Sequence, residues 1–177
     1  MVRVSVLRYG HRSVRDYRVT SHCALVARAF GAGKIIICGE EDESIRRSIE
    51  KVVEKWGGTF SIGFSDSWKN EFKKFRKNRN SAIVHLTMYG IPLQKAIGKI
   101  RKFRNIMVVI GSQKVEGAVY ENSDFNVGVT QQPHSEIAAL AVFLHELFRG
   151  KGLGGRFPNA KIRIIPKEKG KKVVKRE

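Results

Sequence analysis

The first 150 residues alternate between short runs rich in β-branched residues and longer segments with a helical spacing of apolar residues, and this order constrains the fold most. β-Branched runs favour strands, while apolar residues three and four positions apart favour amphipathic helices. Their repetition implies an α/β fold in which a mostly parallel sheet carries helices on both faces. The predicted strands are Val2–Leu7, Lys34–Cys38, Thr59–Phe64, Ala82–Met88, Ile106–Ile110 and Asn126–Val129.

Capping and stop residues mark the ends of the predicted helices. Ser21 is a candidate cap for a first helix that stops at Gly31, and Gly57-Gly58 stops the second helix. Ser135 is a candidate cap for the last helix. The predicted helices therefore cover residues 21–30, 42–56, 67–75, 92–103 and 135–148.

The composition changes after Phe148. Residues 149–156 contain four glycines and three bases, which is typical of a flexible basic linker. Two short basic runs follow, at Ala160–Pro166 and Lys171–Lys175, and the residues between them predict a β-hairpin. We therefore expect one domain over residues 1–150, and a basic linker and hairpin extension over residues 151–177.

The chain carries 34 Lys and Arg against 16 Asp and Glu, a formal net charge of +18 at pH 7. Five basic segments hold this excess, because the rest of the chain has seven bases and eleven acids. Such a surface attracts polyanions, above all nucleic acid. A thermophile-like surface rich in ion pairs is the alternative, but it requires balanced signs. The basic segments are residues 1–18, 66–80, 95–104, 149–156 and 161–177.

Several classes of protein are disfavoured by what the sequence lacks. Its apolar runs are far shorter than the roughly 20 residues that cross a bilayer, and the N-terminus lacks a signal-peptide core, so we expect a cytoplasmic protein with no membrane partner. Cys23 and Cys38 lie in apolar runs, which favours buried reduced thiols. There is no P-loop, no GxGxxG, no GxSxG turn and no metal-binding spacing of His and Cys, so we expect no metal.

Three turns in the C-terminal half are candidates for a ligand site. Open parallel sheets bind ligands at the carboxyl ends of their strands. The predicted strand ends at residues 87–90, 111–117 and 130–136 carry glycines together with Ser, Thr and Gln. Glycine lets the backbone approach a ligand closely, and the neutral side chains offer donors and acceptors. We expect neighbouring strands to bring these turns together.

The segment after the first predicted strand is rich in arginine. Arg8, Arg12, Arg15 and Arg18 occur within eleven residues. Such side chains can bind backbone phosphates, or lie against a reacting hydroxyl and favour its alkoxide. They can also form structural ion pairs with nearby acids. The residues by themselves leave these three interpretations open.

Residues 84–90, 109–115 and above all 126–140 resemble stretches of the SPOUT methyltransferases. Residues 7–12 and 15–22 look like the archaeal tRNA ribose 2′-O-methyltransferases that act on a cytidine of the T-loop. The resemblance covers essentially the whole chain. It implies a SPOUT fold whose C-terminal segment threads a deep trefoil knot, S-adenosylmethionine held in that knot, tRNA as the substrate, and a homodimer as the working unit.

The resemblance also assigns catalytic and cofactor residues. In related ribose methyltransferases an asparagine and an arginine six positions later mark the catalytic helix, and His22 and Arg28 keep that spacing. Arg28 is therefore the first catalytic candidate and Arg18 the second. The implied S-adenosylmethionine contacts are Leu86, Gly111, Ser112, Gln113, Lys114, Val115, Val129, Thr130, Gln131, Gln132, Pro133, His134, Ser135 and Glu136.

The remaining arginines are assigned to RNA. Arg8, Arg12 and Arg15 are expected to contact it, although Arg8 and Arg12 stay open as catalytic alternatives. Two other functions also remain open at this point: a basic RNA-binding protein without activity, and a SPOUT enzyme that methylates a base or ribosomal RNA.

Overall fold

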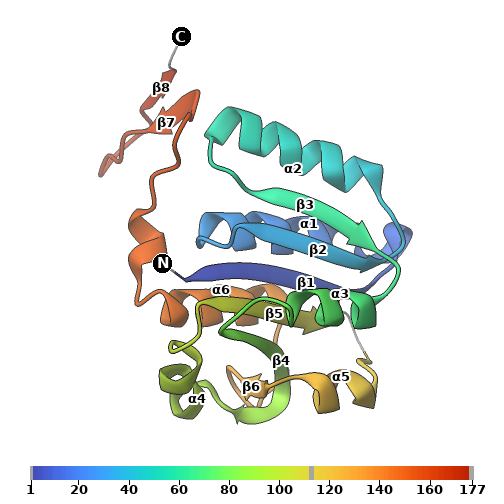
Figure 1. Ribbon diagram of the computed structural model, residues 1–177. Helices are drawn as coiled ribbons and strands as arrows, with labels where there is room; N and C mark the ends of the chain where they lie inside the picture. The colour runs from blue at the N-terminus through green and yellow to red at the C-terminus, as the bar shows by residue number, and fades with distance from the viewer. Residues whose placement is uncertain (1, 112–113, 176–177) are drawn as a thin grey trace.

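The computed structural model describes residues 2–111 and 114–175, and a parallel sheet forms its centre (Figure 1). Within these residues six strands lie in the order β3-β2-β1-β5-β4-β6, and every neighbouring pair is parallel. This confirms the predicted mostly parallel α/β fold. The strands are β1 (Arg3–His11), β2 (Lys34–Gly39), β3 (Ser61–Ser65), β4 (Ser81–Pro92), β5 (Asn105–Gly111) and β6 (Phe125–Gly128).

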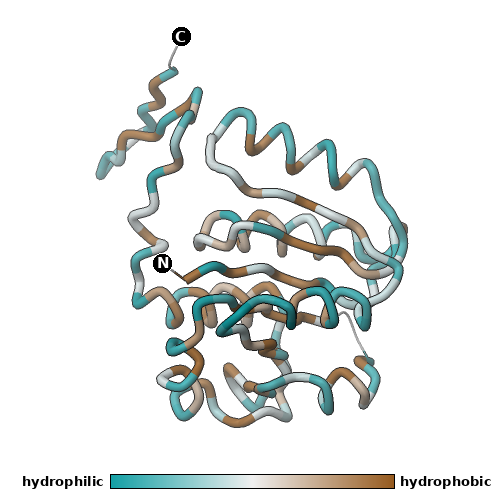
Figure 2. Tube along the Cα trace, viewed as in Figure 1, coloured by the Kyte–Doolittle hydropathy of each residue, from teal (hydrophilic) through white to brown (hydrophobic). Residues whose placement is uncertain are grey.

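Helices cover both faces of the sheet, and successive residues of a strand divide between two hydrophobic cores. In β2, Ile35 and Ile37 join the larger core with α1, α2, α4 and α6, whereas Ile36 and Cys38 join the smaller core with α3 and α5. The two-residue period of a strand produces this division. Figure 2 shows the matching amphipathic pattern along α2. The helices are α1 (Ser13–Ala29), α2 (Glu43–Trp56), α3 (Trp68–Phe75), α4 (Leu93–Ile100), α5 (Gly117–Asn122) and α6 (Glu136–Leu147).

Side-chain caps fix where several helices begin. Asp42 accepts hydrogen bonds from the backbone N–H groups at the start of α2, and Ser67 and Ser135 do the same for α3 and α6. The fourth predicted helix is shorter than expected, because α4 ends at Ile100. In the described ranges no helix is both long and apolar enough to span a membrane.

The predicted start of the first helix is wrong, because α1 begins at Ser13 and not at Ser21. The first two turns carry polar residues without a clear apolar spacing. A local cap and a contact with β1 stabilise them: Asp16 accepts a hydrogen bond from the backbone N–H of the capping residue Arg12 at 3.1 Å, and the side chain of Thr20 is fully buried beside β1. The earlier start places the C-terminal half of the helix farther from the carboxyl edge of the sheet.

The chain end after α6 packs beside the C-terminus of α2. A short 3₁₀ helix, η1 (Lys151–Gly154), is followed by β7 (Ile162–Ile164) and β8 (Val173–Lys175), which pair antiparallel and stand apart from the main sheet (Figure 1). The backbone N–H of Gly58 donates to Pro158 O at 2.8 Å, and Lys161 Nζ lies 2.6 Å from Glu54 Oε1. Residues 157–161 are thus attached to the α/β body.

Candidate active site

A cavity of about 300 Å³ opens at the carboxyl ends of β4 and β5, beside the start of α6. Because β4 lies between β5 and β6, the three predicted turns meet there. The volume is at the lower end of the range for small-molecule sites. The cavity is lined by His85, Leu86, Thr87, Met88, Tyr89, Ile110, Gly111, Val115, Tyr120, Pro133, His134, Glu136 and Ala139.

The structure brings some of the predicted cofactor residues to this cavity and leaves others outside it. Leu86, Gly111, Val115, Pro133, His134 and Glu136 line it. Lys114, Val129, Thr130, Gln131, Gln132 and Ser135 do not, and Ser112 and Gln113 lie outside the described residues. The third turn is instead shaped by its own polar groups: Thr130 Oγ1 accepts from the N–H of Gln132 at 3.3 Å.

Sequence reasoning missed the wall formed by His85 and Tyr120. The Tyr120 hydroxyl lies 3.1 Å from Thr87 Oγ1, and its ring meets the His85 ring edge to face at a centroid distance of 4.6 Å. Burial lowers the pKa of His85, and its hydrogen bond with Asn126 at 3.0 Å opposes this shift. His85 is therefore uncharged at neutral pH, and it forms a polar wall together with Tyr120. No local signal marked Tyr120, because the six residues of α5 are too few to show a helical period.

A loop in β4 crosses β6 at the edge of the cavity. Val127 pairs with Leu86 before the loop and with Ile91 after it, so residues 87–90 leave the ladder. A Cβ atom on Gly90 would lie 2.6 Å from Asn126 O and even closer to neighbouring backbone atoms of β6. Only glycine allows this approach, which holds the cavity-lining residues Thr87–Tyr89 against the last strand.

At the N-terminus of α6, an ion pair links the cavity wall to a buried arginine. Ser135 caps the helix, and Glu136 occupies its first turn, where a carboxylate is favoured by the helix dipole. Glu136 Oε1 lies 3.1 Å from Arg8 Nη2. The Arg8 side chain is 1% exposed and that of Glu136 25% exposed, so the pair connects the interior to the cavity.

The structure buries Arg8, which was predicted to contact RNA, because β1 directs its guanidinium into the protein. Its Nε also donates a long hydrogen bond to Thr20 Oγ1 at 3.4 Å. The Arg8 guanidinium therefore reaches the cavity wall through its ion pair with Glu136.

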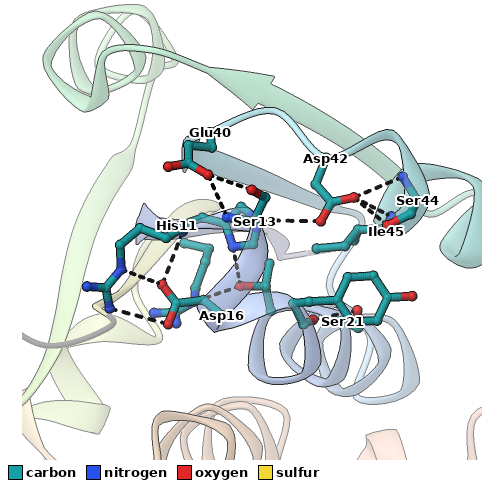
Figure 3. A network of polar contacts seen from close by, with 12 residues as sticks. His11, Ser13, Asp16, Ser21, Glu40, Asp42, Ser44 and Ile45 are labelled. Atoms are coloured by element: carbon teal, nitrogen blue, oxygen red, sulfur yellow. Dashed lines mark hydrogen bonds and ion pairs between the residues drawn. The ribbon is translucent and has the colours of Figure 1, made fainter.

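A polar network extends from His11 to Asp42 at the start of α2, and Figure 3 labels these two residues together with Ser13 and Glu40. His11 Nδ1 lies 2.9 Å from Thr20 Oγ1, and His11 Nε2 lies 3.9 Å from Asp42 Oδ2. Burial lowers the pKa of His11 more than Asp42 raises it, and the positive charge of Arg8 adds to the lowering. Ser13 donates from both its N–H and its hydroxyl to Glu40. These contacts of His11 and Ser13 connect the arginine-rich segment to the residues around the start of α2.

The structure does not bring Arg28, the first catalytic candidate, to the cavity. Arg28 lies in the last turn of α1, at the end of the helix farthest from the cavity. Its Nη2 donates to Gly57 O at 2.6 Å and its guanidinium lies 4.2 Å from the centroid of the Phe157 ring. Burial lowers the pKa of Arg28. This side chain joins α1 to the turn after α2 and to the chain end.

The other arginines of α1 and its cap are at the surface. Arg15 and Arg18 are exposed, and Arg12 is half-exposed with its Nε 3.1 Å from Asp16 Oδ2. None of the three lines the cavity. Among the described residues no three His, Cys, Asp or Glu side chains gather as a metal site requires.

Comparison with known sequences decides the family. A family model described as "tRNA ribose 2'-O-methyltransferase, aTrm56" matches residues 56–174. The chain belongs to this family. A tRNA (cytidine(56)-2'-O)-methyltransferase of Thermococcus kodakarensis is 51% identical and covers 98% of each chain. A protein of the same name from Sulfurisphaera tokodaii is 54% identical and covers 94% of this chain and 99% of its own.

Solved structures share the fold at low sequence identity. The SpoU methyltransferase AviRb from Streptomyces viridochromogenes, solved in complex with the cofactor AdoMet, superposes with a TM-score of 0.63 at 15% identity. The match covers 88% of this chain and 59% of AviRb. The TrmH/SpoU tRNA modifying enzyme of A. aeolicus gives a TM-score of 0.58 at 15% identity, over 86% of this chain and 76% of its own. The family and the fold of this tRNA ribose methyltransferase therefore agree.

Proposed function

We propose that this enzyme transfers a methyl group from S-adenosylmethionine to the 2′-hydroxyl of cytidine 56 in tRNA. The relatives named for that reaction match this chain over almost their whole length. The observation that carries the proposal is the cavity at the ends of β4 and β5, where an open α/β sheet binds its ligands. The strong positive charge of the chain suits a tRNA substrate.

The cavity fits S-adenosylmethionine in its chemistry. Leu86, Ile110 and Val115 offer apolar contacts to an adenine ring. The Val115 side chain packs so closely against the backbone of Gly111 that a Cβ atom at this position would collide with it. Glu136 places a carboxylate at one side, which suits a ligand with cationic groups. When bound, S-adenosylmethionine supplies a methyl group already activated by a sulfonium. The remaining predicted contacts, from Lys114 and residues 129–135, belong to this proposal as parts of the turns that shape the cavity.

We also propose that the C-terminal segment forms the trefoil knot expected of this fold. The supporting observation is the contact between the loop at residues 87–90 and β6, which Gly90 makes possible. The following turn stays in contact with that loop, since Gln131 Nε2 donates to Gly90 O at 3.4 Å. In this arrangement residues 1–150 form the catalytic domain and residues 151–177 an extension.

A homodimer would complete the site. Val14, Tyr17 and Leu25 are 98%, 40% and 37% exposed along α1, an apolar stripe suited to burial against a second copy. Arg18 is exposed on the same helix and does not line the cavity of its own subunit. We therefore propose that Arg18 acts in the cavity of the partner subunit, with Arg12 and Arg15 holding nearby phosphates.

In that position Arg18 would stabilise negative charge on the ribose oxygen as its proton leaves. An arginine remains protonated near neutral pH and is therefore a poor general base. Its contribution is electrostatic and positional: alignment of two reactants and a preorganised cation each lower the barrier by several kcal/mol, on the order of 3 or more. The enzyme would act in the cytoplasm, where tRNA is its substrate.

The decisive experiment is methyl transfer followed by nucleoside analysis. A tRNA transcript is incubated with tritiated S-adenosylmethionine, digested and separated, and 2′-O-methylcytidine is the expected product. Arg18→Ala should reduce kcat by about 100-fold or more. Arg47→Ala, an exposed arginine of α2, is the matched control and should retain wild-type activity. Label in a base, or absence of label from RNA that binds, would contradict the proposal.

A further inference from the structure

A second cavity, of about 310 Å³, lies on the face of the sheet covered by α3 and α5. It is lined by Trp68, Lys69, Phe72, Lys73 and Arg76 from α3 and the residue after it, and by Asn122 at the end of α5. These α3 residues are three and four positions apart, so one side of the helix presents both aromatic and basic groups. The sequence placed them in a basic segment but did not show that they enclose a cavity.

Two aromatic rings form a rigid floor. Trp68 and Phe72 meet edge to face with centroids 4.9 Å apart and are only 8% and 4% exposed. They pack on the smaller core, which fixes their orientation. The Nζ of Lys69 lies 5.6 Å from the Trp68 ring, so its charge stands at the rim. An apolar floor below a cationic rim suits a nucleotide, whose base or sugar is apolar in part and whose phosphate is anionic.

The rim has cations without acidic partners. Residues 66–80 contain six bases and two acids. Glu71 pairs with Lys74 at 2.9 Å, and Arg76 is shared between Asp124 and Asn122 O. In the part of the chain that the structure describes, Lys69 and Lys73 have no ion pair. Two uncompensated ammonium groups one helical turn apart match successive anionic groups of a polyanion.

The two cavities lie on either side of α5. Tyr120 of this helix lines the first cavity, and Asn122 lines the second. Glu116, the residue before α5, accepts hydrogen bonds from both Tyr9 and Trp68, so α3 is tied directly to the turn beside the first cavity. A helix of six residues is about 9 Å long. One RNA molecule can therefore reach both cavities, and the α1 stripe leaves this face uncovered in the proposed dimer.

We propose that the α3 cavity binds a second segment of the same tRNA, outside the arm that carries the methylated nucleotide. Phosphates contact Lys69 and Lys73, and a sugar or base edge rests on the Trp68–Phe72 floor. This inference rests on the proposed function, because it takes the tRNA substrate from it. The uncompensated positive charge favours RNA over a protein partner.

The test compares two double variants that each lose two positive charges. Lys69→Ala/Lys73→Ala changes the cavity rim, and Lys51→Ala/Lys55→Ala removes exposed lysines with the same spacing from α2. Affinity for an unmodified full-length tRNA transcript is measured by filter binding over a range of KCl concentrations. Affinity decreases with salt, and the steepness of log affinity against log salt should decrease by about 1 to 2 for the cavity variant. It should remain unchanged for the control. Equal melting temperatures show that both variants fold.

Two further measurements sharpen the result. In a Trp56→Phe background Trp68 is the remaining tryptophan, and full-length tRNA should quench its emission. A stem-loop containing the target cytidine should bind the cavity variant and the control equally well. An unchanged salt slope would overturn the proposal and leave the cavity to an acidic protein. Equal loss of affinity for the stem-loop would also overturn it, because the contact would then lie in the target arm.

These outcomes are separable from failure of the proposed function. If wild-type protein methylates cytidine but the cavity variant keeps the wild-type salt slope, only the present inference is refuted. If wild-type protein binds tRNA without methylating it and the slope still falls in the cavity variant, the α3 contact is supported and the enzymatic proposal is refuted.

Discussion

Replacing Glu136 with glutamine should destabilise the protein through Arg8. The substitution keeps the shape of the side chain but removes the charge that faces the buried guanidinium at 3.1 Å. Arg8 then faces a neutral amide oxygen and keeps its long hydrogen bond to Thr20 at 3.4 Å. A buried cation without a counter-charge is costly because the protein interior cannot replace its hydration.

The size of the effect follows from the burial of the two partners. Removing one partner of a fully buried pair costs about 3–5 kcal/mol. Because the Glu136 side chain is 25% exposed, solvent screens part of the interaction, and we expect a loss of about 2–3 kcal/mol in the free energy of unfolding. For a chain of this length each kcal/mol lowers Tm by about 2–4 °C, so Tm should fall by about 4–12 °C.

A double-mutant cycle separates this cause from a simple loss of packing. Urea unfolding is followed by circular dichroism at one fixed protein concentration for wild type, Glu136→Gln, Arg8→Met and the double variant. Since Arg8→Met removes the buried charge, the double variant should be more stable than Glu136→Gln. A double variant that shows the sum of the two single losses would refute the reasoning, because the two side chains would then act independently.

Three further predictions concern other parts of the fold. Gly90→Ala should lower the free energy of unfolding in urea by about 1–3 kcal/mol, because the new Cβ meets the backbone of β6. Gly98→Ala is the control: it has open space around it and should raise the free energy of unfolding by about 0.5–1 kcal/mol. Because burial lowers the pKa of His11 in the fold, the unfolded state binds a proton first as the pH falls below about 6.5, so stability should decrease from that pH until the folded His11 also titrates. His11→Gln should flatten this part of a Tm-against-pH curve, and an unchanged slope would contradict the assignment. Arg28→Met should lower stability by about 1.5–3 kcal/mol through its lost hydrogen bond, yet keep kcat within about twofold on tRNA; a 100-fold loss of kcat would restore Arg28 as a catalytic residue.

Local chemistry made most of the fold predictable. The strands were found within a few residues of their observed ends, because a run such as Ile35–Cys38 has the β-branched content of a buried strand. Helix starts were found where a side chain caps the backbone, as at Asp42 and Ser135. The start of α1 was missed because its first turns are held by Arg8 and His11 of β1, which are distant from Thr20 in sequence. Helix α5 was missed because it is short.

The candidate site was predictable only as a set of turns. The rule that ligands bind at strand ends, together with the resemblance, selected residues 86, 111–115 and 129–136, and six of these residues line the cavity. Which arginine serves the site could not be predicted, since spacing along a helix does not tell which end of it faces the cavity. The structure places Arg28 at the far end, Arg8 in the interior, and Arg18 at the surface.

The sequence by itself determined the alternation of strands and helices, the positive charge and the family, because each depends on residue types and their local order. Tertiary structure alone decided which charges are buried and which are free. Arg8 and Lys69 are both basic residues in basic segments, but one is enclosed beside Glu136 and the other stands at the rim of a cavity. That difference arises from contacts between segments far apart in the chain, which fix the desolvation and the partners of each charge.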